Sequence, residues 1–255
     1  MKISGILGHP LKKPRSIKIW KDYFSRKGIN SSMVKFDIKP KNLANFFEYI
    51  KVKKNFQAMA ITMPYKKKVI KFTDKLDKFA TMAGAVNLII KKNNNLIGYN
   101  TDVYGAYLSI KKELQKNNKI VIIGLGGTGQ AIFNFLYNKF KKKQFILISR
   151  KFKIKRKKNI KIFQSLNEKI FTEKLIIINC TPLGSNLKTD FLKQTPIKSK
   201  FLKKIKKQSF IFDIIYSPKE TLLSYECKKN KIKYLNGIKM NTLQAKRALS
   251  LAFGK

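Results

Sequence analysis

A lysine and an aspartate stand at the ends of two short polar motifs, and their side chains suit proton transfer. Lys66 closes the segment 61–66, Ile-Thr-Met-Pro-Tyr-Lys, and Asp102 closes the segment 100–102, Asn-Thr-Asp. Both segments interrupt apolar, strand-forming sequence. A lysine and a carboxylate that meet at strand ends can pass a proton to or from a substrate oxygen while each keeps the other charged. We therefore expect Lys66 and Asp102 to be a catalytic pair.

Each of these residues also has a non-catalytic interpretation. Lys66 begins a run of three lysines, which is typical of surface charge, and Asp102 is suited to cap a helix that begins near Val103. His9 is the only histidine in the chain. We expect it to pack or hydrogen-bond locally, because no carboxylate is placed in sequence to orient it as a base.

A glycine-rich turn follows soon after the second motif. The segment 124–129 reads Gly-Leu-Gly-Gly-Thr-Gly; it follows the apolar run 120–123 and precedes the helical run 130–140. In that context the pattern predicts a dinucleotide site, because glycines allow a tight turn and let a pyrophosphate approach the helix N-terminus. The expected contacts are Gly124, Gly126, Gly127, Thr128 and Gly129. Proton chemistry next to such a loop indicates an oxidoreductase.

The end of the next predicted strand indicates which dinucleotide binds. NAD sites usually carry an acidic residue there, whereas NADP sites carry arginine near the 2′-phosphate. This chain has Ser149, Arg150 and Lys151 and no carboxylate at that point. We therefore predict NADP as the cofactor, held in part by these three residues.

Alternating strand-like and helix-like segments predict an α/β protein with two parallel-rich sheets. The first series runs to about residue 100 and ends in a hairpin at the sheet's edge, and the second begins at Lys119. Predicted strands cover 2–7, 32–37, 58–62, 86–90, 96–99, 120–123, 145–149, 175–179 and 210–215. Predicted helices include 17–27, 43–52, 101–115 and 240–253.

Composition excludes some function classes and leaves others open. The net charge is +44, but only five of the 57 basic residues are arginine, the side chain that base-reading and phosphate-binding surfaces prefer. A coding sequence rich in A and T would enrich lysine, isoleucine, asparagine and phenylalanine together, so we expect no specific nucleic-acid partner. A polyanion-binding protein remains the alternative from another class.

The cysteines and the apolar runs point to a cytoplasmic protein. Cys180 and Cys227 follow neither a metal-ligand spacing nor a disulfide framework, so no metal is expected. No apolar run approaches the ~18 residues that a membrane span needs. The segment 1–8 is interpreted as a first strand rather than an export signal.

The ordered set of motifs resembles the shikimate dehydrogenase family over nearly the whole chain. It comprises Gly8-His9-Pro10 with Ser16, the segments 62–66, 83–87 and 98–102, the glycine loop, the segments 179–184 and 213–216, and Gly237, Met240 and Gln244-Ala245. The resemblance implies an NADPH-linked, reversible reduction of 3-dehydroshikimate to shikimate, a step of chorismate and aromatic amino acid biosynthesis.

The resemblance also implies two three-layer α/β domains around a cleft. Residues 1–101 plus 238–255 would form the substrate domain, to which the last helix returns, and residues 102–237 the Rossmann-type NADP domain. The protein would be a monomer or a homodimer.

Site residues follow from the matched motifs. Lys66 and Asp102 would be catalytic. The substrate would be bound by Ser16, Thr62, Asn87, Tyr216 and Gln244. The cofactor site would also include Thr181 and Ile214, and Gly237 and Met240 would line the nicotinamide.

Two positions depart from the family pattern. Pro14 replaces the first of two serines that usually grip the substrate, and Ala60 replaces an asparagine two residues before Thr62. Each lost partner of a buried polar group typically costs about 1–3 kcal/mol. Lys12, Lys13 or Arg15 are candidates to meet the substrate carboxylate instead. The substrate is therefore expected to be shikimate, quinate or a related ring acid.

Overall fold

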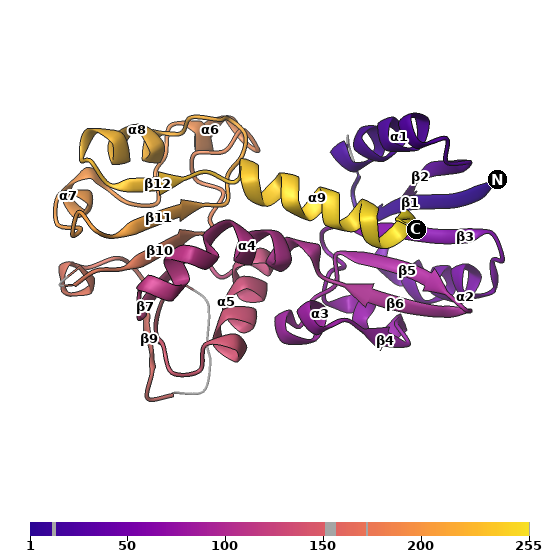
Figure 1. Ribbon diagram of the computed structural model, residues 1–255, viewed down its shortest axis with the longest axis horizontal. Coiled ribbons are helices and arrows are strands. Elements are labelled where there is room, and N and C mark those ends of the chain that lie inside the picture. Colours follow the sequence, from indigo (N-terminus) through magenta and orange to yellow (C-terminus); the bar gives the residue numbers. More distant parts are fainter. Residues whose placement is uncertain (12–13, 151–156, 172, 255) are drawn as a thin grey trace. The chain divides into compact units, whose positions relative to one another are not determined.

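The computed structural model describes residues 1–11, 14–150, 157–171 and 173–254, which form two compact units. The first unit is Met1–Tyr104 with Gln244–Lys255, and the second is Gly105–Leu243. Each contains a six-stranded sheet flanked by helices (Figure 1). The predicted α/β class is thereby confirmed. The division into a substrate domain (1–101 plus 238–255) and a cofactor domain (102–237) stays a prediction.

The sheet of the first unit is mixed. Its strand order is β2-β1-β3-β5-β6-β4, with β1 parallel to β2 and β3, and β5 antiparallel to β3 and β6. The predicted hairpin is the β5–β6 pair, but the two-residue β4 covers it and forms the edge. The elements are β1 (Lys2–Gly8), α1 (Arg15–Lys27), β2 (Ser31–Asp37), α2 (Leu43–Val52), β3 (Phe56–Ile61), β4 (Lys75–Leu76), α3 (Lys78–Ala83), β5 (Leu88–Lys92), β6 (Asn95–Tyr99) and the end of α9 (Ile238–Phe253).

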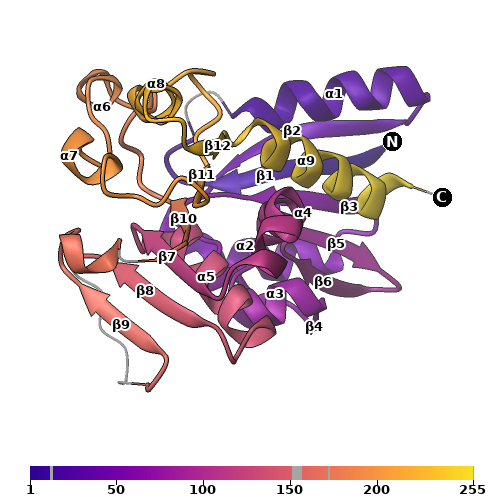
Figure 2. The ribbon, with the colours of Figure 1, turned by 60° about the vertical axis from the view of Figure 1, so that its left-hand side comes forward.

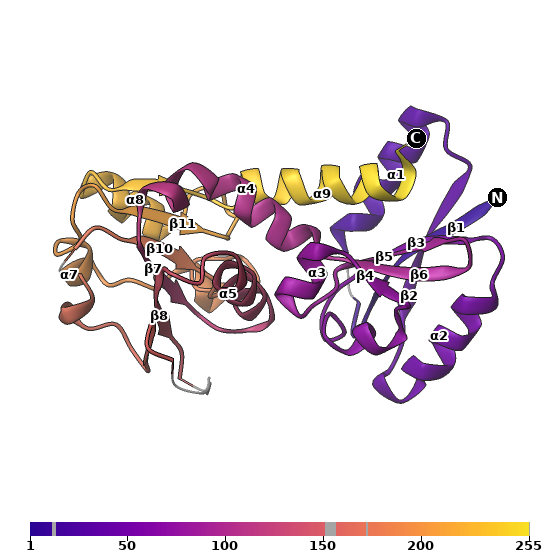
Figure 3. The ribbon, with the colours of Figure 1, turned by 60° about the horizontal axis from the view of Figure 1, so that its bottom comes forward.

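Helices cover both faces of this sheet because its strands are apolar on both sides. Trp20 and Phe24 of α1 pack with Leu249 of α9 on one face, and Phe47 and Ile50 of α2 pack on the other. Figure 3 shows α1 and α2 on opposite sides of the strands. The last turns of α9 are therefore part of the first unit's core.

The second unit has an all-parallel sheet with the order β12-β11-β10-β7-β8-β9. Figure 2 shows β7, β8 and β9 side by side and pointing the same way. The elements are β7 (Lys119–Ile123), α5 (Gly127–Lys139), β8 (Gln144–Ile148), β9 (Ile160–Phe163), β10 (Ile176–Asn179), α6 (Thr189–Leu192), α7 (Ser199–Leu202), β11 (Phe210–Asp213), α8 (Leu222–Lys229) and β12 (Lys233–Leu235), preceded by α4 (Thr101–Lys116).

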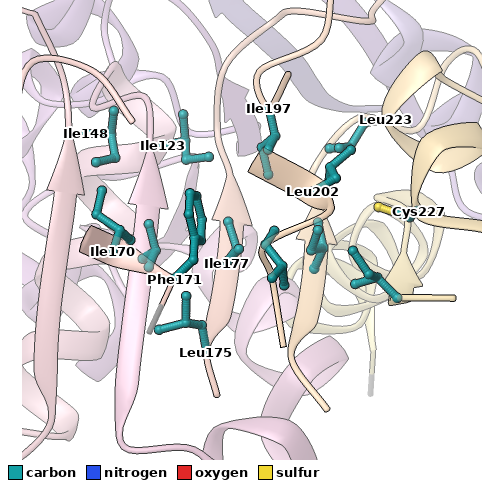
Figure 4. Packing of buried hydrophobic residues seen from close by; sticks show 14 of the residues in the cluster. Ile123, Ile148, Ile170, Phe171, Leu175, Ile177, Ile197, Leu202, Leu223 and Cys227 are labelled. Atoms are coloured by element: carbon teal, nitrogen blue, oxygen red, sulfur yellow. The ribbon is translucent and has the colours of Figure 1, made fainter. Parts of the chain in front are cut away.

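The central strands of this sheet are buried on both faces, which explains their nearly unbroken isoleucine and phenylalanine. On one face, Ile123, Ile148 and Ile177 form a layer against Ile170 and Phe171 (Figure 4). Apolar residues of α5 are buried as well. Strands covered on both sides need this composition, since no alternate position meets water.

Two strands of the second sheet are absent from the sequence prediction. β9 and β12 are short edge strands, and none of their residues is fully buried. Edge strands of this kind lack the apolar run that marks a central strand, so composition gives no signal for them. The second series has six strands rather than the four predicted.

No helix in the described ranges combines the length and the apolar character that crossing a membrane requires.

Candidate functional site

Lys66 and Asp102 form an ion pair within the first unit. Lys66 Nζ lies 2.6 Å from Asp102 Oδ2, and the two side chains are 26% and 18% exposed. A partly shielded ammonium–carboxylate contact of this length is a charge-assisted hydrogen bond, which fixes the position of the Lys66 nitrogen. Lys66 therefore differs from the exposed Lys67 and Lys68 that follow it.

Asp102 is free for this pairing because another residue caps its helix. Asn100 Oδ1 accepts a hydrogen bond from Val103 N at 3.0 Å, which is the geometry of a helix N-cap. The interpretation of Asp102 as the cap is therefore wrong. Asn100 is also anchored through its Nδ2, which donates to Ala85 O at 2.8 Å.

The backbone around Lys66 is anchored at several points. Lys66 O accepts from Val86 N at 2.7 Å, and Thr62 N donates to Leu7 O at 2.9 Å. Tyr65 is fully buried, and its hydroxyl donates to Ile38 O. The segment leading to the lysine is thereby held against the ends of β1, β2 and β5, so the ammonium starts from a fixed backbone position.

Three further polar side chains, those of Asn87, Thr101 and Gln244, are hydrogen-bonded together at the start of α4, the helix that carries Asp102. Asn87 Nδ2 donates to Thr101 Oγ1 at 3.0 Å, and Thr101 N donates to Asn87 Oδ1 at 2.8 Å. Thr101 Oγ1 also donates to Gln244 Oε1 at 3.3 Å. Gln244 is half-buried. Thr101 links the predicted substrate residues and was not itself predicted, although it stands inside the Asn-Thr-Asp motif.

Ser16 and Thr62 follow the carboxyl ends of two neighbouring parallel strands, β1 and β3. Ser16 is half-buried in the first turn of α1, after the extended Pro14. Thr62 lies against Gly8, where a Cβ would come within 2.5 Å of Thr62 Cγ2. Ala60 packs against the cluster beneath α1 and α9. Lys12, Lys13 and the side chain of Arg15 fall outside the part of the chain that the structure describes.

His9 has a carboxylate partner, contrary to the sequence expectation. His9 Nδ1 lies 2.8 Å from Asp37 Oδ1, and Asp37 Oδ2 accepts from Leu11 N at 3.0 Å. These hydrogen bonds, that from Leu11 first, hold the pKa of Asp37 below its usual value. Asp37 reaches His9 because β1 and β2 are parallel with Gly8 opposite Asp37. The local bonding of His9 predicted from sequence is correct, while the absence of an orienting carboxylate is wrong.

The second unit contains the glycine loop between β7 and α5. Gly124 has φ +87°, and a Cβ on Gly129 would come within 2.0 Å of Gly124 O, so both positions require glycine. A Cβ on Gly126 or Gly127 would meet no atom within 4 Å. The turn is thus packed on its inner side and open on its outer side, where α5 begins at Gly127 beside Thr128. That arrangement fits a pyrophosphate at the helix N-terminus.

The other predicted cofactor residues lie at the ends of neighbouring strands. Ser149 is half-buried and Arg150 is exposed directly after β8, while Lys151 lies outside the described residues. Thr181 packs on the loop, since a Cβ on Gly124 would lie 2.7 Å from Thr181 Cγ2.

Gly237 is packed against the segment after β11. A Cβ on Gly237 would lie 2.0 Å from Ile214 O, so these two predicted residues are brought together. Met240 is buried in α9, and Tyr216 is 38% exposed.

The glycine loop and the end of β8 together fit a dinucleotide with a 2′-phosphate. The glycine turn is open on its outer side, and the strand that follows it ends at the cation Arg150 and not at a carboxylate.

A buried polar network lies beneath these strand ends; Asn179 and Asp213 stand in two of the matched motifs, but neither was predicted as a site residue. Asp213 is fully buried and accepts hydrogen bonds from Asn179 Nδ2 at 3.0 Å, Ile215 N at 3.1 Å and Tyr234 Oη at 3.1 Å. Burial raises the pKa of Asp213 to about 6, although these donors oppose the shift. The aspartate was visible in sequence, but its partners were not.

Within the ranges described above, no group of three or more histidine, cysteine, aspartate and glutamate side chains is arranged to hold a metal ion.

Comparison with known proteins gives matches over nearly the full chain. Residues 6–89 match a family described as the shikimate dehydrogenase substrate binding domain. The NADP(+) shikimate dehydrogenase of Clostridium botulinum is 31% identical over 256 residues, covering 98% of this chain and 96% of that protein. The corresponding enzyme of Methanocaldococcus jannaschii is 31% identical over 268 residues, covering 99% and 92%.

Solved structures agree with these matches. A crystal structure of a shikimate dehydrogenase in complex with NADP+ superposes with a TM-score of 0.80 at 28% identity, covering all of this chain and 90% of the other. The shikimate dehydrogenase of Aquifex aeolicus gives a TM-score of 0.78 at 26% identity, with 100% and 93% covered.

Proposed function

The chain belongs to the shikimate dehydrogenase family, and on that premise we propose that it catalyses the NADP-dependent, reversible reduction of 3-dehydroshikimate to shikimate. The observation that supports this most directly is the 2.6 Å contact between Lys66 and Asp102. The reaction implied by the family lies in the chorismate and aromatic amino acid pathway. The enzyme is an oxidoreductase that acts on a CH-OH group.

Lys66 and Asp102 handle the proton in this proposal. NADPH, when bound, supplies the hydride. Negative charge then grows on the substrate's carbonyl oxygen, and the Lys66 ammonium stabilises it by hydrogen bonding and donates a proton to it. Asp102 keeps the lysine charged and oriented, and accepts a hydrogen bond from a neighbouring substrate hydroxyl. In the reverse direction Lys66 takes the proton back.

The remaining predicted residues divide between substrate and cofactor. Asn87, Thr62, Ser16, Gln244 and Tyr216 bind the hydroxyls and the carboxylate. The glycine loop holds the pyrophosphate, and Ser149, Arg150 and Lys151 hold the 2′-phosphate. Thr181 and Ile214 also contact the cofactor, and Gly237 and Met240 line the nicotinamide.

Pro14 and Ala60 are the reason for considering a second substrate. Pro14 offers neither a hydroxyl nor a backbone N–H, and Ala60 offers no amide group. With two fewer polar contacts than the family pattern, the pocket discriminates less between similar ring acids. Quinate is therefore the alternative substrate.

One assay tests the function and the substrate together. Purified protein is mixed with NADP+ and either shikimate or quinate, and NADPH formation is followed by its absorbance. We expect turnover with shikimate, and the ratio of kcat/KM for the two acids ranks them. No turnover with either acid would remove the proposal.

We expect a cytoplasmic monomer or homodimer without a specific nucleic-acid partner. The +44 charge supports the other candidate function, binding of a polyanion. Tight binding of RNA or DNA that persists at physiological salt would favour it, whereas binding lost with modest salt is nonspecific lysine electrostatics.

A further inference from the structure

The buried network around Asp213 connects elements that are distant in sequence. Asn179 ends β10, Asp213 ends β11 and Tyr234 lies in β12. Tyr234 Oη also lies 3.4 Å from the hydroxyl of Thr221, which caps α8 in a capping box with Ser224. The carboxylate is therefore shared between two strands and a helix cap.

One branch of the network leads to the glycine loop. Asn179 Oδ1 accepts from Thr181 N at 3.0 Å and from Thr181 Oγ1 at 2.8 Å. Thr181 in turn packs on Gly124. The position of Thr181 against the loop thus depends on which way the Asn179 amide points.

A second branch leads to Gly237. Ile215 N donates to Asp213 Oδ1, and Ile215 O accepts from Gly237 N at 2.8 Å. The Ile214 carbonyl, which a Cβ on Gly237 would strike, belongs to the same peptide. Asp213 therefore fixes the backbone at this second group of cofactor residues as well.

The chemistry of a carboxylate explains why an aspartate stands here. An ionised carboxylate only accepts hydrogen bonds, so the Asn179 NH2 must face it and the Asn179 oxygen must face Thr181. A protonated acid or an amide at position 213 also donates, and then the Asn179 amide can turn over. Its NH2 would then face the Thr181 N–H, so the hydrogen bond from Thr181 N would be lost, and the Thr181 hydroxyl would have to change from donor to acceptor.

We propose that Asp213 is a positioning residue for the dinucleotide: through Asn179 it holds Thr181 against the glycine loop, and through Ile215 it holds the backbone beside Gly237. This inference rests on the proposed function, since it takes these residues as the NADP site. Asp213 touches neither substrate nor reacting atoms.

Protonation of Asp213 gives the proposal a measurable consequence, a pH dependence of cofactor binding. The titratable groups that face Asp213 are Tyr234, Cys180 and Cys227; burial, and second to it the Asp213 carboxylate, raises the pKa of both thiols and of the phenol. The Asp213 pKa of about 6 makes the residue ionised at pH 7.5 and largely protonated at pH 5.5. Cofactor binding should therefore weaken toward pH 5.5 through loss of this carboxylate.

The test compares NADP+ binding by calorimetry at pH 7.5 and 5.5 in the wild type, Asp213→Asn and Tyr234→Phe. At pH 7.5 we expect Kd to rise about 10-fold in D213N and about 3-fold in Y234F, because hydrogen bonds of about 1 kcal/mol are lost. KM for shikimate and kcat at saturating NADP+ should stay unchanged. The exposed Asp190→Asn is the matched control in the same unit.

The pH dependence separates positioning from a general loss of stability. The 2′-phosphate of NADP+ also titrates in this range, so the ratio of variant to wild-type Kd is compared. That ratio should fall from about 10 at pH 7.5 to about 3 or less at pH 5.5, since the wild type is then mostly protonated. A ratio near 1 at both pH values would overturn the proposal.

Other outcomes are equally decisive. If D213N does not fold, Y234F and the wild-type pH dependence remain, and a Y234F affinity within the error of wild type overturns the proposal. If D213N and Y234F both bind NADP+ like the wild type, Asp213 does not position the cofactor, although the proposed function stands. If the wild type binds no NADP+, the proposed function fails first.

Discussion

Two aspartates of this chain are held in opposite ways. Asp102, in the first unit, is 18% exposed along its side chain and faces the cationic Lys66 at 2.6 Å. Asp213, in the second unit, is fully buried and its donors Asn179, Ile215 and Tyr234 are all neutral. One carboxylate has a counter-charge and access to water, and the other has only fixed dipoles.

The difference corresponds to what each carboxylate has to do. A group that takes part in proton transfer must keep its charge stable while its neighbour gains and loses a proton, and a partly exposed ion pair allows this. A group that only holds geometry gains from burial, because few alternative hydrogen bonds are available there. The cost is that burial makes the ionised form of Asp213 less favourable, and its pKa is raised for this reason.

The largest effect is expected at Lys66. Replacing it with alanine removes the proton donor, so kcat should fall by roughly 10³-fold or more while NADP+ affinity is kept. Steady-state kinetics and calorimetry measure the two quantities. Lys68→Ala, which alters an exposed lysine of the same run, should keep wild-type kcat. Near-normal activity of K66A would refute the catalytic role.

A smaller loss is expected at Asp102. Asp102→Asn keeps the shape of the side chain but leaves Lys66 without its counter-charge, so kcat should fall roughly 10²-fold. The exposed Asp22→Asn serves as the control. If D102N affected NADP+ binding more than kcat, Asp102 would belong with Asp213 as a positioning group and the contrast between them would fail.

At Arg150 the expected change concerns cofactor choice. Arg150→Gln removes a charged partner of the 2′-phosphate, so kcat/KM for NADP+ should fall about 10-fold while the value for NAD+ changes little. Arg26→Gln, on α1 of the first unit, is the matched control. A wild-type preference for NAD+ over NADP+ by tenfold or more would contradict the assignment.

A last effect is expected on stability and again involves Asp213. Its pKa is about 6 in the folded protein and about 3.9 in an unfolded chain, so the folded state binds the proton more tightly. The free energy of unfolding should therefore fall as the pH rises from about 4 to about 6, by roughly 1 kcal/mol per pH unit at most, and then level off.

Urea unfolding of the wild type and D213N across this range measures that slope. The variant should lack this contribution, because an amide does not titrate. A stability difference between the two proteins that stays constant with pH would show that Asp213 is ionised throughout, and would remove the pH signature proposed for cofactor binding.

Sequence patterns predicted the parts of the fold that are marked by composition. Central strands such as 120–123 and 175–179 are apolar because both faces are covered, and they were found. β9 and β12 were missed because edge strands need no such run. The glycine loop was predictable because Gly124 and Gly129 meet a steric requirement that no other residue satisfies.

Contacts that arise from sheet register could not be predicted in this way. His9 and Asp37 are 28 positions apart and meet because β1 and β2 pair in parallel. Tyr234 reaches Asp213 across 21 positions. Without the register, a lone histidine and a buried aspartate carry no sign of their partners.

The end of α9 has a consequence for how the protein is made. The aromatic side chain of Phe253 packs edge-on against Trp20, with ring centroids 5.3 Å apart, and Ala248 and Leu249 complete the same cluster. During synthesis on the ribosome, the earliest residues of the first unit must therefore wait for the last turns of the chain before their core closes. The second unit emerges and can fold within that interval, so the unit begun first is the one completed last.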